Sequence, residues 1–189
     1  MAKKVIVLLA GGFEEVEAVT PVDYLRRSGL EVTAAAIGGN LAVKGARGIT
    51  INADITLAEL ARQGKAAAAS WDAVILPGGM SGASNLAASK ETAALLREMA
   101  AAGKWVCAIC ASPAVVLAPL GLLSGKKFTC YPGMEEKVRD GKWSEDNVVI
   151  DGNIITSRGA GTAGAFAVAI IGCLLGEAEG KKTADSVLL

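Results

Sequence analysis

The sequence predicts an α/β fold in which a mostly parallel sheet lies between two layers of helices. Short apolar runs of strand length alternate with longer segments of helical period, which is the pattern of βα units. Runs such as VIVLL and AVIL are apolar on both faces, as strands are when helices cover both sides of a sheet. A length of 189 residues suits one domain, residues 1–189, that buries a sizeable core without disulfide bonds.

The elements follow in order along the chain. Apolar runs bounded by glycine, proline or polar residues predict strands at 3–10, 30–38, 47–54, 71–79, 103–110, 126–130, 147–152 and 153–157. Segments of helical period predict helices at 14–28, 57–63, 82–87, 90–102, 112–119, 133–139 and 161–176. Sheets of this kind bind ligands outside the carboxyl ends of their strands, so we expect the chemistry just after Ala10, Leu76 and Ile109.

Composition narrows the choice of partner. Because 19 Lys and Arg balance 19 Asp and Glu, there is no net charge to attract nucleic acid or an acidic membrane surface. The most apolar windows are shorter than the roughly 20 residues that span a bilayer, and the start of the chain lacks a secretory pattern. We therefore expect a cytoplasmic protein with four free thiols, whose partner is a small molecule or a second copy of itself.

The chain contains no histidine. This absence excludes a Cys-His dyad, a Ser-His-Asp triad and any metal site that uses histidine ligands.

Two cysteines stand three residues apart in WVCAICASPAVVLA, residues 105–118. Side chains alternate along a strand, so Cys107 shares a face with Trp105 and Ile109, and Cys110 points to the opposite face. The diverging sulfurs argue against a dithiol redox pair. We expect Cys107 and Cys173 to be core residues, because free cysteine is among the most buried side chains. Cys130 lies at the end of a predicted strand and is a candidate resolving or auxiliary thiol near Cys110.

Cys110 is the candidate nucleophile. It lies where a strand must turn into a helix, and the small Ala111 and Ser112 beside it leave access to the sulfur. Pro113 suits an early helical position. A thiol at a helix amino terminus meets a partial positive charge that favours the thiolate, so the turn that exposes Cys110 is also expected to activate it.

Acidic residues and glycines follow two other predicted strands. Glu14 and Glu15 suit the first turn of a helix, where carboxylates complement the helix dipole. Glu17 shares a helical face with Thr20 and Tyr24 and is a candidate functional carboxylate. At the end of the segment 71–79, consecutive Gly78 and Gly79 predict either a plain turn or a loop whose amide N–H groups face a ligand.

Four segments together resemble the ThiJ/PfpI superfamily, in the branch of the Parkinson-disease protein deglycase and its bacterial ThiJ-like relatives. They are KKVIVLLAGGFEEVEAVTPVDYLRRSG, DAVILPGGMSGASNL, VCAICASPAVVLA and IITSRGAGTAGAFAVAII, and the resemblance runs from about residue 3 to 180. It implies the flavodoxin-like fold of the class I glutamine amidotransferase type. It also implies a homodimer through residues of about 15–28 and 47–53.

The resemblance also implies roles for single residues. Cys110 falls on the family's reactive elbow cysteine, Glu17 on the glutamate that bonds its sulfur, and Gly79 and Ala111 on backbone donors of an oxyanion pocket. The residues expected near the pocket or the interface are Gly78, Ser112, Tyr131, Arg27, Arg47 and Arg158. The alternative interpretation of the three arginines is ordinary surface charge. Tyr131 stands where many relatives carry a histidine, which makes amidotransferase or protease chemistry improbable.

The activity implied by the resemblance is that of a glyoxalase or protein deglycase, and it implies neither a metal nor an organic cofactor. Cys110 would add to a 2-oxoaldehyde such as methylglyoxal, or to its early adducts on protein and nucleotide amines, and form a hemithioacetal. An alternative is a redox-responsive stress or chaperone-like protein in which Cys110 oxidises to a sulfinate. A third is a folded family member whose activity lapsed with its histidine.

Overall fold

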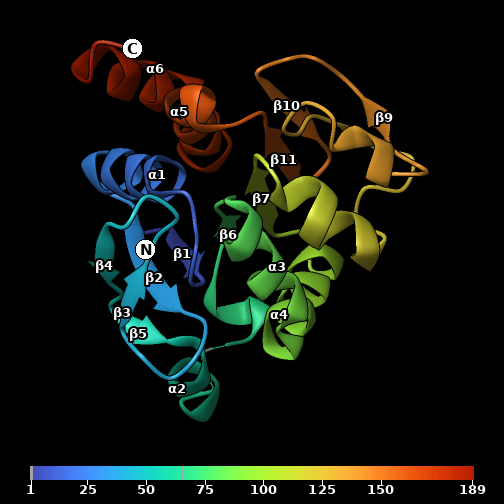
Figure 1. The fold of residues 1–189 in the computed structure, drawn as a ribbon. Coiled ribbons are helices and arrows are strands. Elements are labelled where there is room, and N and C mark those ends of the chain that lie inside the picture. Colours follow the sequence, from blue (N-terminus) through green and yellow to red (C-terminus); the bar gives the residue numbers. More distant parts are fainter. Residues whose placement is uncertain (1, 65) are drawn as a thin grey trace.

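One seven-stranded sheet organises the molecule (Figure 1). The computed structural model describes residues 2–64 and 66–189. The strand order is β10-β11-β7-β6-β1-β2-β5, and all neighbours are parallel except β10 and β11, which pair antiparallel at one edge. Their bounds are Lys4–Leu9 (β1), Glu31–Ala36 (β2), Ile55–Thr56 (β5), Ala73–Leu76 (β6), Trp105–Ile109 (β7), Val148–Asp151 (β10) and Ile154–Ser157 (β11). The predicted fold class is therefore confirmed.

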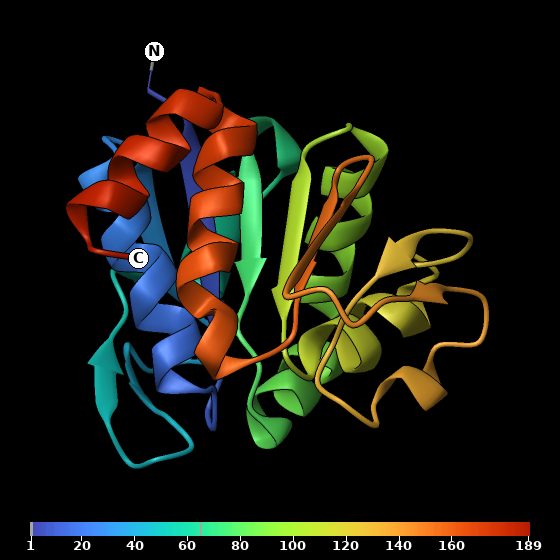
Figure 2. The ribbon, with the colours of Figure 1, turned by 90° about the horizontal axis from the view of Figure 1, so that it is seen from above.

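Helices cover both faces of this sheet (Figure 2). α1, α5 and α6 pack together on one face, and α3 and α4 lie on the other. The helix bounds are Glu15–Arg27 (α1), Leu57–Arg62 (α2), Met80–Ala88 (α3), Lys90–Ala101 (α4), Ala163–Leu175 (α5) and Glu177–Ser186 (α6). Within the described part of the chain, every helix is too short or too polar to cross a membrane.

The central strands divide the core into two layers. Along β1, Val5 and Val7 pack into the apolar cluster that includes α1 and α5, whereas Ile6 and Leu8 pack into the cluster that includes α3 and α4. All four side chains are fully buried. A strand that is apolar on both faces is thus explained by a helical layer on each side.

Two predicted strands lie largely outside the main sheet. The segment at 47–54 contains β4 (Thr50–Asn52), which pairs with β3 (Ala42–Lys44) in a separate hairpin. The segment at 126–130 contains β8 (Lys127–Phe128), which pairs with β9 (Lys142–Trp143). Their partners are short strands that a local pattern does not identify.

Three helical segments differ from the prediction. The segment at 112–119 is a π-helical turn, Pro113–Leu117, followed by a 3-10 turn, Ala118–Leu120. The helix predicted at 133–139 is wrong, because only the 3-10 turn Glu135–Lys137 forms there. α6 has no counterpart among the predicted helices, and its Gly180 is a residue that disfavours a helix. A Cβ at Gly180 would lie 3.1 Å from the carbonyl oxygen of Val168, so the glycine lets α6 pack closely on α5.

Candidate active site

Cys110 occupies a strained turn at the carboxyl end of β7. Its φ of 64° lies in the left-handed region, which costs about 1–2 kcal/mol for a residue with a side chain. Hydrogen bonds hold this turn on both sides, because the N–H of Cys110 donates to Ser157 O at 2.9 Å and the N–H of Tyr131 donates to Cys110 O at 2.9 Å. The side chain is half-buried and lines a cavity. The predicted position of Cys110 at the end of a strand is confirmed.

Glu17 lies on α1, and its side chain contacts that of Cys110. Its side chain is fully buried, and Oε2 accepts a hydrogen bond from the N–H of Gly78 at 2.8 Å. Oε1 accepts no hydrogen bond from a nitrogen or oxygen donor among the residues that the structure describes. The carboxyl group bonds the Cys110 side chain. Glu17 therefore has one satisfied oxygen and one that is available for chemistry.

Gly78 is required by the close approach of these two side chains. A Cβ at this position would lie 2.6 Å from Cys110 Cβ and 2.7 Å from Glu17 Oε2. Both distances are shorter than any normal van der Waals contact. The strand-end glycine thus does more than turn the chain, since it lets Glu17 and Cys110 meet.

Burial sets the protonation of Glu17. It raises the pKa of the carboxyl from its ordinary value of 4.5 to about 7, against the hydrogen bonds with Gly78 and Cys110, and the charge of Glu14 raises it further. A substantial fraction of Glu17 is therefore protonated at neutral pH. A protonated carboxyl donates a hydrogen bond to a thiolate, whereas a charged one repels it.

The pKa of Cys110 moves opposite to the sequence-based expectation. Burial and then the negative charge of Glu17 raise it from 9.0 to about 12, although the N–H groups of Gly79 and Ala111 bond the sulfur and lower it. The start of the short π-helical turn does not outweigh these two effects. Cys110 and Glu17 consequently titrate as a pair, which carries one negative charge between pH of about 7 and about 12.

Gly79 and Ala111 bring two backbone donors to the sulfur. Gly79 has a φ of 85°, and a Cβ there would overlap the carbonyl oxygen of Gly12 and lie 2.8 Å from the N–H nitrogen of Glu14. Ser112 stabilises this arrangement, because its buried Oγ donates a hydrogen bond to Pro77 O at 2.6 Å. This bond joins the segment that follows β6 to the segment that follows β7. Ser112 is therefore a structural residue outside the cavity lining.

The cavity above Cys110 has a volume of about 490 Å³. Its lining includes Glu14, Glu17, Arg47, Cys110, Tyr131 and Met134. That volume lies in the range of small-molecule sites. Tyr131 is 54% exposed and forms part of the wall.

Sequence reasoning did not identify the contact that brings Arg47 to the cavity. Oε1 of the buried Glu15 accepts hydrogen bonds from the N–H groups of Arg47 and Ile49, at 2.7 and 3.2 Å, and so holds the turn between β3 and β4 against α1. Arg47 Nη2 then lies 3.7 Å from Glu14 Oε2. A Cβ at Gly45 would overlap the Glu15 carboxyl, so this glycine was the available clue.

Two of the predicted pocket arginines, Arg27 and Arg158, lie outside the cavity lining, as do Gly78 and Ser112. Arg27 pairs with Asp23, one turn earlier on the exposed side of α1, with Nε and Oδ2 separated by 2.7 Å. Arg158 donates from Nη1 to Glu145 O at 2.9 Å, in the loop before β10. Of the three arginines expected near the pocket or the interface, only Arg47 belongs to the cavity lining.

The other cysteines lie apart from this cavity. Cys107 is fully buried between β7 and the α1–α5 layer, as predicted. Cys130 is fully buried as well, and burial and the charge of Glu135 raise its pKa to about 12. Cys173, expected in the core, is only half-buried on α5, where it packs against the buried cluster. All four cysteines are free, as expected.

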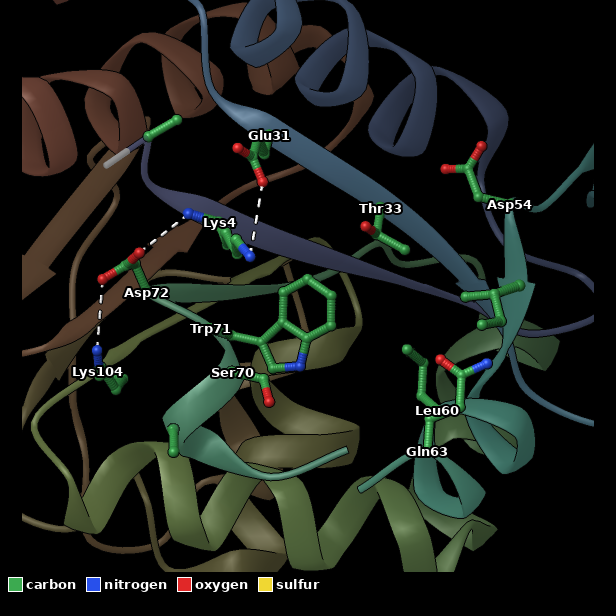
Figure 3. A pocket seen from close by; sticks show the side chains of 13 residues that line it. Lys4, Glu31, Thr33, Asp54, Leu60, Gln63, Ser70, Trp71, Asp72 and Lys104 are labelled. Atoms are coloured by element: carbon green, nitrogen blue, oxygen red, sulfur yellow. Dashed lines mark hydrogen bonds and ion pairs between the residues drawn. The ribbon is translucent and has the colours of Figure 1, made fainter. Parts of the chain in front are cut away.

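A larger cavity, of about 670 Å³, lies where the parallel strands begin, at what we call the amino edge of the sheet (Figure 3). The strand ends that carry Cys110 form the opposite, carboxyl edge. Trp71 points into it, beside Lys4 of β1 and Glu31 of β2. The charged groups in its lining are already paired with one another or with neighbours: Lys4 with Glu31, Lys104 with Asp72, and Asp54 with Arg26. The charged groups of this cavity therefore stabilise the fold by pairing with one another and with neighbouring side chains.

Comparisons with known proteins agree with the fold. The DJ-1/PfpI family model matches residues 3–172. The solved structure of Drosophila melanogaster DJ-1beta is 40% identical, covers 100% of this chain and 99% of its own, and superposes with a TM-score of 0.92. That of oxidized Toxoplasma gondii DJ-1 is 36% identical, covers 99% and 98%, and has a TM-score of 0.93.

Curated relatives include one with an enzymatic name. The glutathione-independent glyoxalase DJR-1.2 of Caenorhabditis elegans is 36% identical over 93% of this chain and 88% of its own length. The chain spans only 41% of the length of two Arabidopsis thaliana relatives, DJ-1 homologs B and A, which are 40% and 42% identical to it. The family model and these relatives show that the chain belongs to the DJ-1/PfpI family.

Proposed function

We propose that the protein is a cofactor-free enzyme of the glyoxalase or deglycase type. Its substrates would be 2-oxoaldehydes such as methylglyoxal, or their early adducts on protein and nucleotide amines. The observation that carries this proposal is the meeting of Cys110, the buried Glu17 and two backbone N–H donors in one cavity. The name of the Caenorhabditis elegans relative supports the same reaction class. Four free thiols suit a cytoplasmic location.

The reactive form is the singly charged pair. Between these two pKa values the proton lies mainly on Cys110, because the pKa of its thiol, about 12, exceeds that of Glu17, about 7. In the minor arrangement the proton lies on Glu17 and the charge on Cys110, so that a nucleophilic thiolate stands beside a carboxylic acid, and the N–H groups of Gly79 and Ala111 stabilise it. The sulfur adds to the aldehyde carbon, and the Glu17 proton passes to the carbonyl oxygen. The product is a hemithioacetal on Cys110, formed without a histidine base.

The test is lactate formation from methylglyoxal by purified protein. We expect activity to disappear in Cys110→Ser and to persist in Cys173→Ser, a matched control because Cys173 is half-buried on α5 and outside the cavity lining. Equal background rates in all three proteins would remove the enzyme proposal for this substrate.

A redox-responsive role is the second candidate. The donors that would hold an oxyanion, Gly79 N–H and Ala111 N–H, would equally hold the oxygens of a Cys110 sulfinate, and a protonated Glu17 would donate to it. The oxidized Toxoplasma gondii relative supports this reading. Peroxide titration followed by peptide mass analysis tests it, and it fails if Cys110 is no more oxidisable than Cys173.

We also propose a homodimer through α1 and the hairpin of β3 and β4. Val16 and Val19 are 48% and 49% exposed on α1, and Ile49 in the hairpin turn is 59% exposed. Glu15 fixes this turn to the start of α1, so the three apolar side chains belong to one surface. In sedimentation, Val19→Glu should shift the protein to monomer and Ile150→Glu, an exposed position on β10, should not. A monomeric wild type would contradict the proposal.

A further inference from the structure

The proposed conversion of a 2-oxoaldehyde to a hydroxy acid consumes one water molecule. After capture, the hemithioacetal carbon is oxidised and the neighbouring carbonyl carbon is reduced by a proton shift, which leaves a hydroxyacyl thioester on Cys110. Water must then attack the thioester carbonyl. Such an enzyme needs a place for this water and a base that accepts its proton.

Gly159 borders a space beside the free oxygen of Glu17. The residue follows β11 and begins the 3-10 turn Ala160–Thr162. The nearest neighbours of an added Cβ would be Tyr131 Cδ2 at 3.5 Å and Glu17 Oε1 at 4.0 Å. The bare Cα therefore faces the gap between the Tyr131 ring and the one Glu17 oxygen that lacks a nitrogen or oxygen donor within the described chain.

Backbone conformation does not explain this glycine. Its φ of 169° is extended, and any residue can adopt it. Its hydrogen bonds use only main-chain atoms, with its N–H donating to Thr162 Oγ1 at 3.1 Å and its carbonyl accepting from Thr162 N at 2.8 Å. The distances of 3.5 and 4.0 Å are ordinary contacts, so alanine would fit. What alanine would change is the space itself.

We propose that Gly159 keeps open a binding site for the hydrolytic water between Glu17 Oε1 and the Tyr131 ring. This inference rests on the proposed function. Glu17, Tyr131 and Ala160 all line the cavity above Cys110, so the water reaches the thioester from the same side as the substrate.

The chemistry of this step balances on the pair. The water oxygen bonds to the thioester carbon, one water proton goes to Glu17 Oε1, and the carbon–sulfur bond breaks with its electron pair on the sulfur. The hydroxy acid leaves, and the site returns to a Cys110 thiolate beside a protonated Glu17. Gly79 N–H and Ala111 N–H stabilise the leaving thiolate. Each turnover therefore regenerates the reactive form of the pair.

The test compares Gly159→Ala with Gly161→Ala, a control two residues along in the same turn, where an added Cβ would have nothing within 4 Å. We expect Gly159→Ala to capture methylglyoxal on Cys110 at the wild-type rate but to form lactate roughly 10²-fold more slowly. A hydroxylamine-sensitive adduct should accumulate on Cys110 by intact mass. Gly161→Ala should match the wild type in both steps.

A second comparison separates a filled water site from a damaged fold. Truncating the ring restores space, so adding Gly159→Ala to Tyr131→Ala should slow hydrolysis much less than adding it to the wild type. If the wild type forms lactate and Gly159→Ala forms it at the same rate, the water site would be overturned and the proposed function would stand. So would loss of capture in Gly159→Ala, or an undiminished effect in the double variant. Absence of lactate from the wild type would overturn the proposed function and the water site with it.

Discussion

At the amino edge and the carboxyl edge of the sheet, the pKa of a carboxyl group shifts in opposite directions. At the amino edge, burial alone would raise the pKa of Asp72, but the N–H of Lys4 and the ammonium groups of Lys3 and Lys104 outweigh it and hold the pKa below 3.8. At the carboxyl edge, Glu17 receives one backbone N–H, and burial raises its pKa to about 7. The same charge is stabilised at one edge and penalised at the other.

This difference separates a structural carboxylate from a chemical one. The oxygens of Asp72 accept hydrogen bonds that tie the loop before β6 to the starts of β1 and β7. Glu17 keeps Oε1 unbonded by nitrogen or oxygen donors of the described chain, and it lies beside a cysteine held in a strained turn. Strain and unsatisfied groups that the rest of the fold must offset gather at functional sites. The smaller cavity, at the carboxyl edge, is therefore the better candidate site.

The largest effect should follow removal of the Glu17 carboxyl. Because Glu17 transfers protons in both capture and hydrolysis, Glu17→Ala should lower kcat/KM for methylglyoxal by about 10²- to 10⁴-fold. Asp72→Asn changes a carboxylate at the other edge and should leave turnover unchanged, which steady-state lactate assays measure. Comparable losses in the two variants would erase the distinction between the edges.

Separating Glu17 from Cys110 should have the next largest effect. Gly78→Ala inserts a Cβ 2.6 Å from Cys110 Cβ and 2.7 Å from Glu17 Oε2, so one of the two must move. We expect turnover to fall by roughly 10²-fold and the free energy of unfolding to fall by about 1–3 kcal/mol.

Gly39→Ala is the control for this substitution, since an added Cβ there has nothing within 4 Å. Turnover assays and urea unfolding of both variants check the prediction. Full activity in Gly78→Ala would mean that contact between Glu17 and Cys110 is not needed.

The reactivity of Cys110 should rise as pH increases through about 7, where the pair loses its first proton. Below that pH both groups are neutral and no thiolate is present. In Glu17→Gln this limb should disappear, and alkylation should rise only above pH 9.0, because burial still raises the thiol pKa from that ordinary value. Iodoacetamide alkylation of Cys110, followed by peptide mass analysis from pH 5 to 10, measures both profiles. Identical profiles would show that the two groups titrate independently.

Local pattern was sufficient for the parts of this site that depend on one element. Strand alternation and the small residues after Ile109 predicted which cysteine turns outward, and β7 and the φ of Cys110 agree with it. The face shared by Glu17, Thr20 and Tyr24 identified Glu17 as the carboxylate to examine. These are properties of a single strand and a single helix.

The rest of the site depends on contacts between distant segments. The direction of the Cys110 pKa follows from burial in the folded chain and from the charge of Glu17, which lies 93 positions earlier in the sequence. Arg47 reaches the cavity only because Glu15 binds its turn. The role of Gly159 appears only when Tyr131 and Glu17 are brought together. No local period contains this information.

The smallest effects should appear in stability and should have opposite signs at the two edges. Folding raises the Glu17 pKa from 4.5 to about 7, so its contribution to stability is present below pH 4.5 and is lost as pH rises through about 7. Glutamine cannot ionise and keeps an acceptor for Gly78 N–H. Glu17→Gln should therefore be more stable than the wild type at pH 8 by up to roughly 3 kcal/mol, and this advantage should nearly vanish at pH 4.

Asp72→Asn supplies the opposite case. Its lowered pKa contributes stability above pH 3.8 that is lost only as pH falls through the folded value, so the variant should be less stable at pH 8 by about 1 kcal/mol. Most of this deficit should persist at pH 4, because folded Asp72 is still ionised there. Urea unfolding of both variants at pH 8 and pH 4 measures the two differences. If Glu17→Gln were destabilised at pH 8, the Glu17 carboxylate would be a stabilising group like Asp72, and the contrast between the edges would not exist.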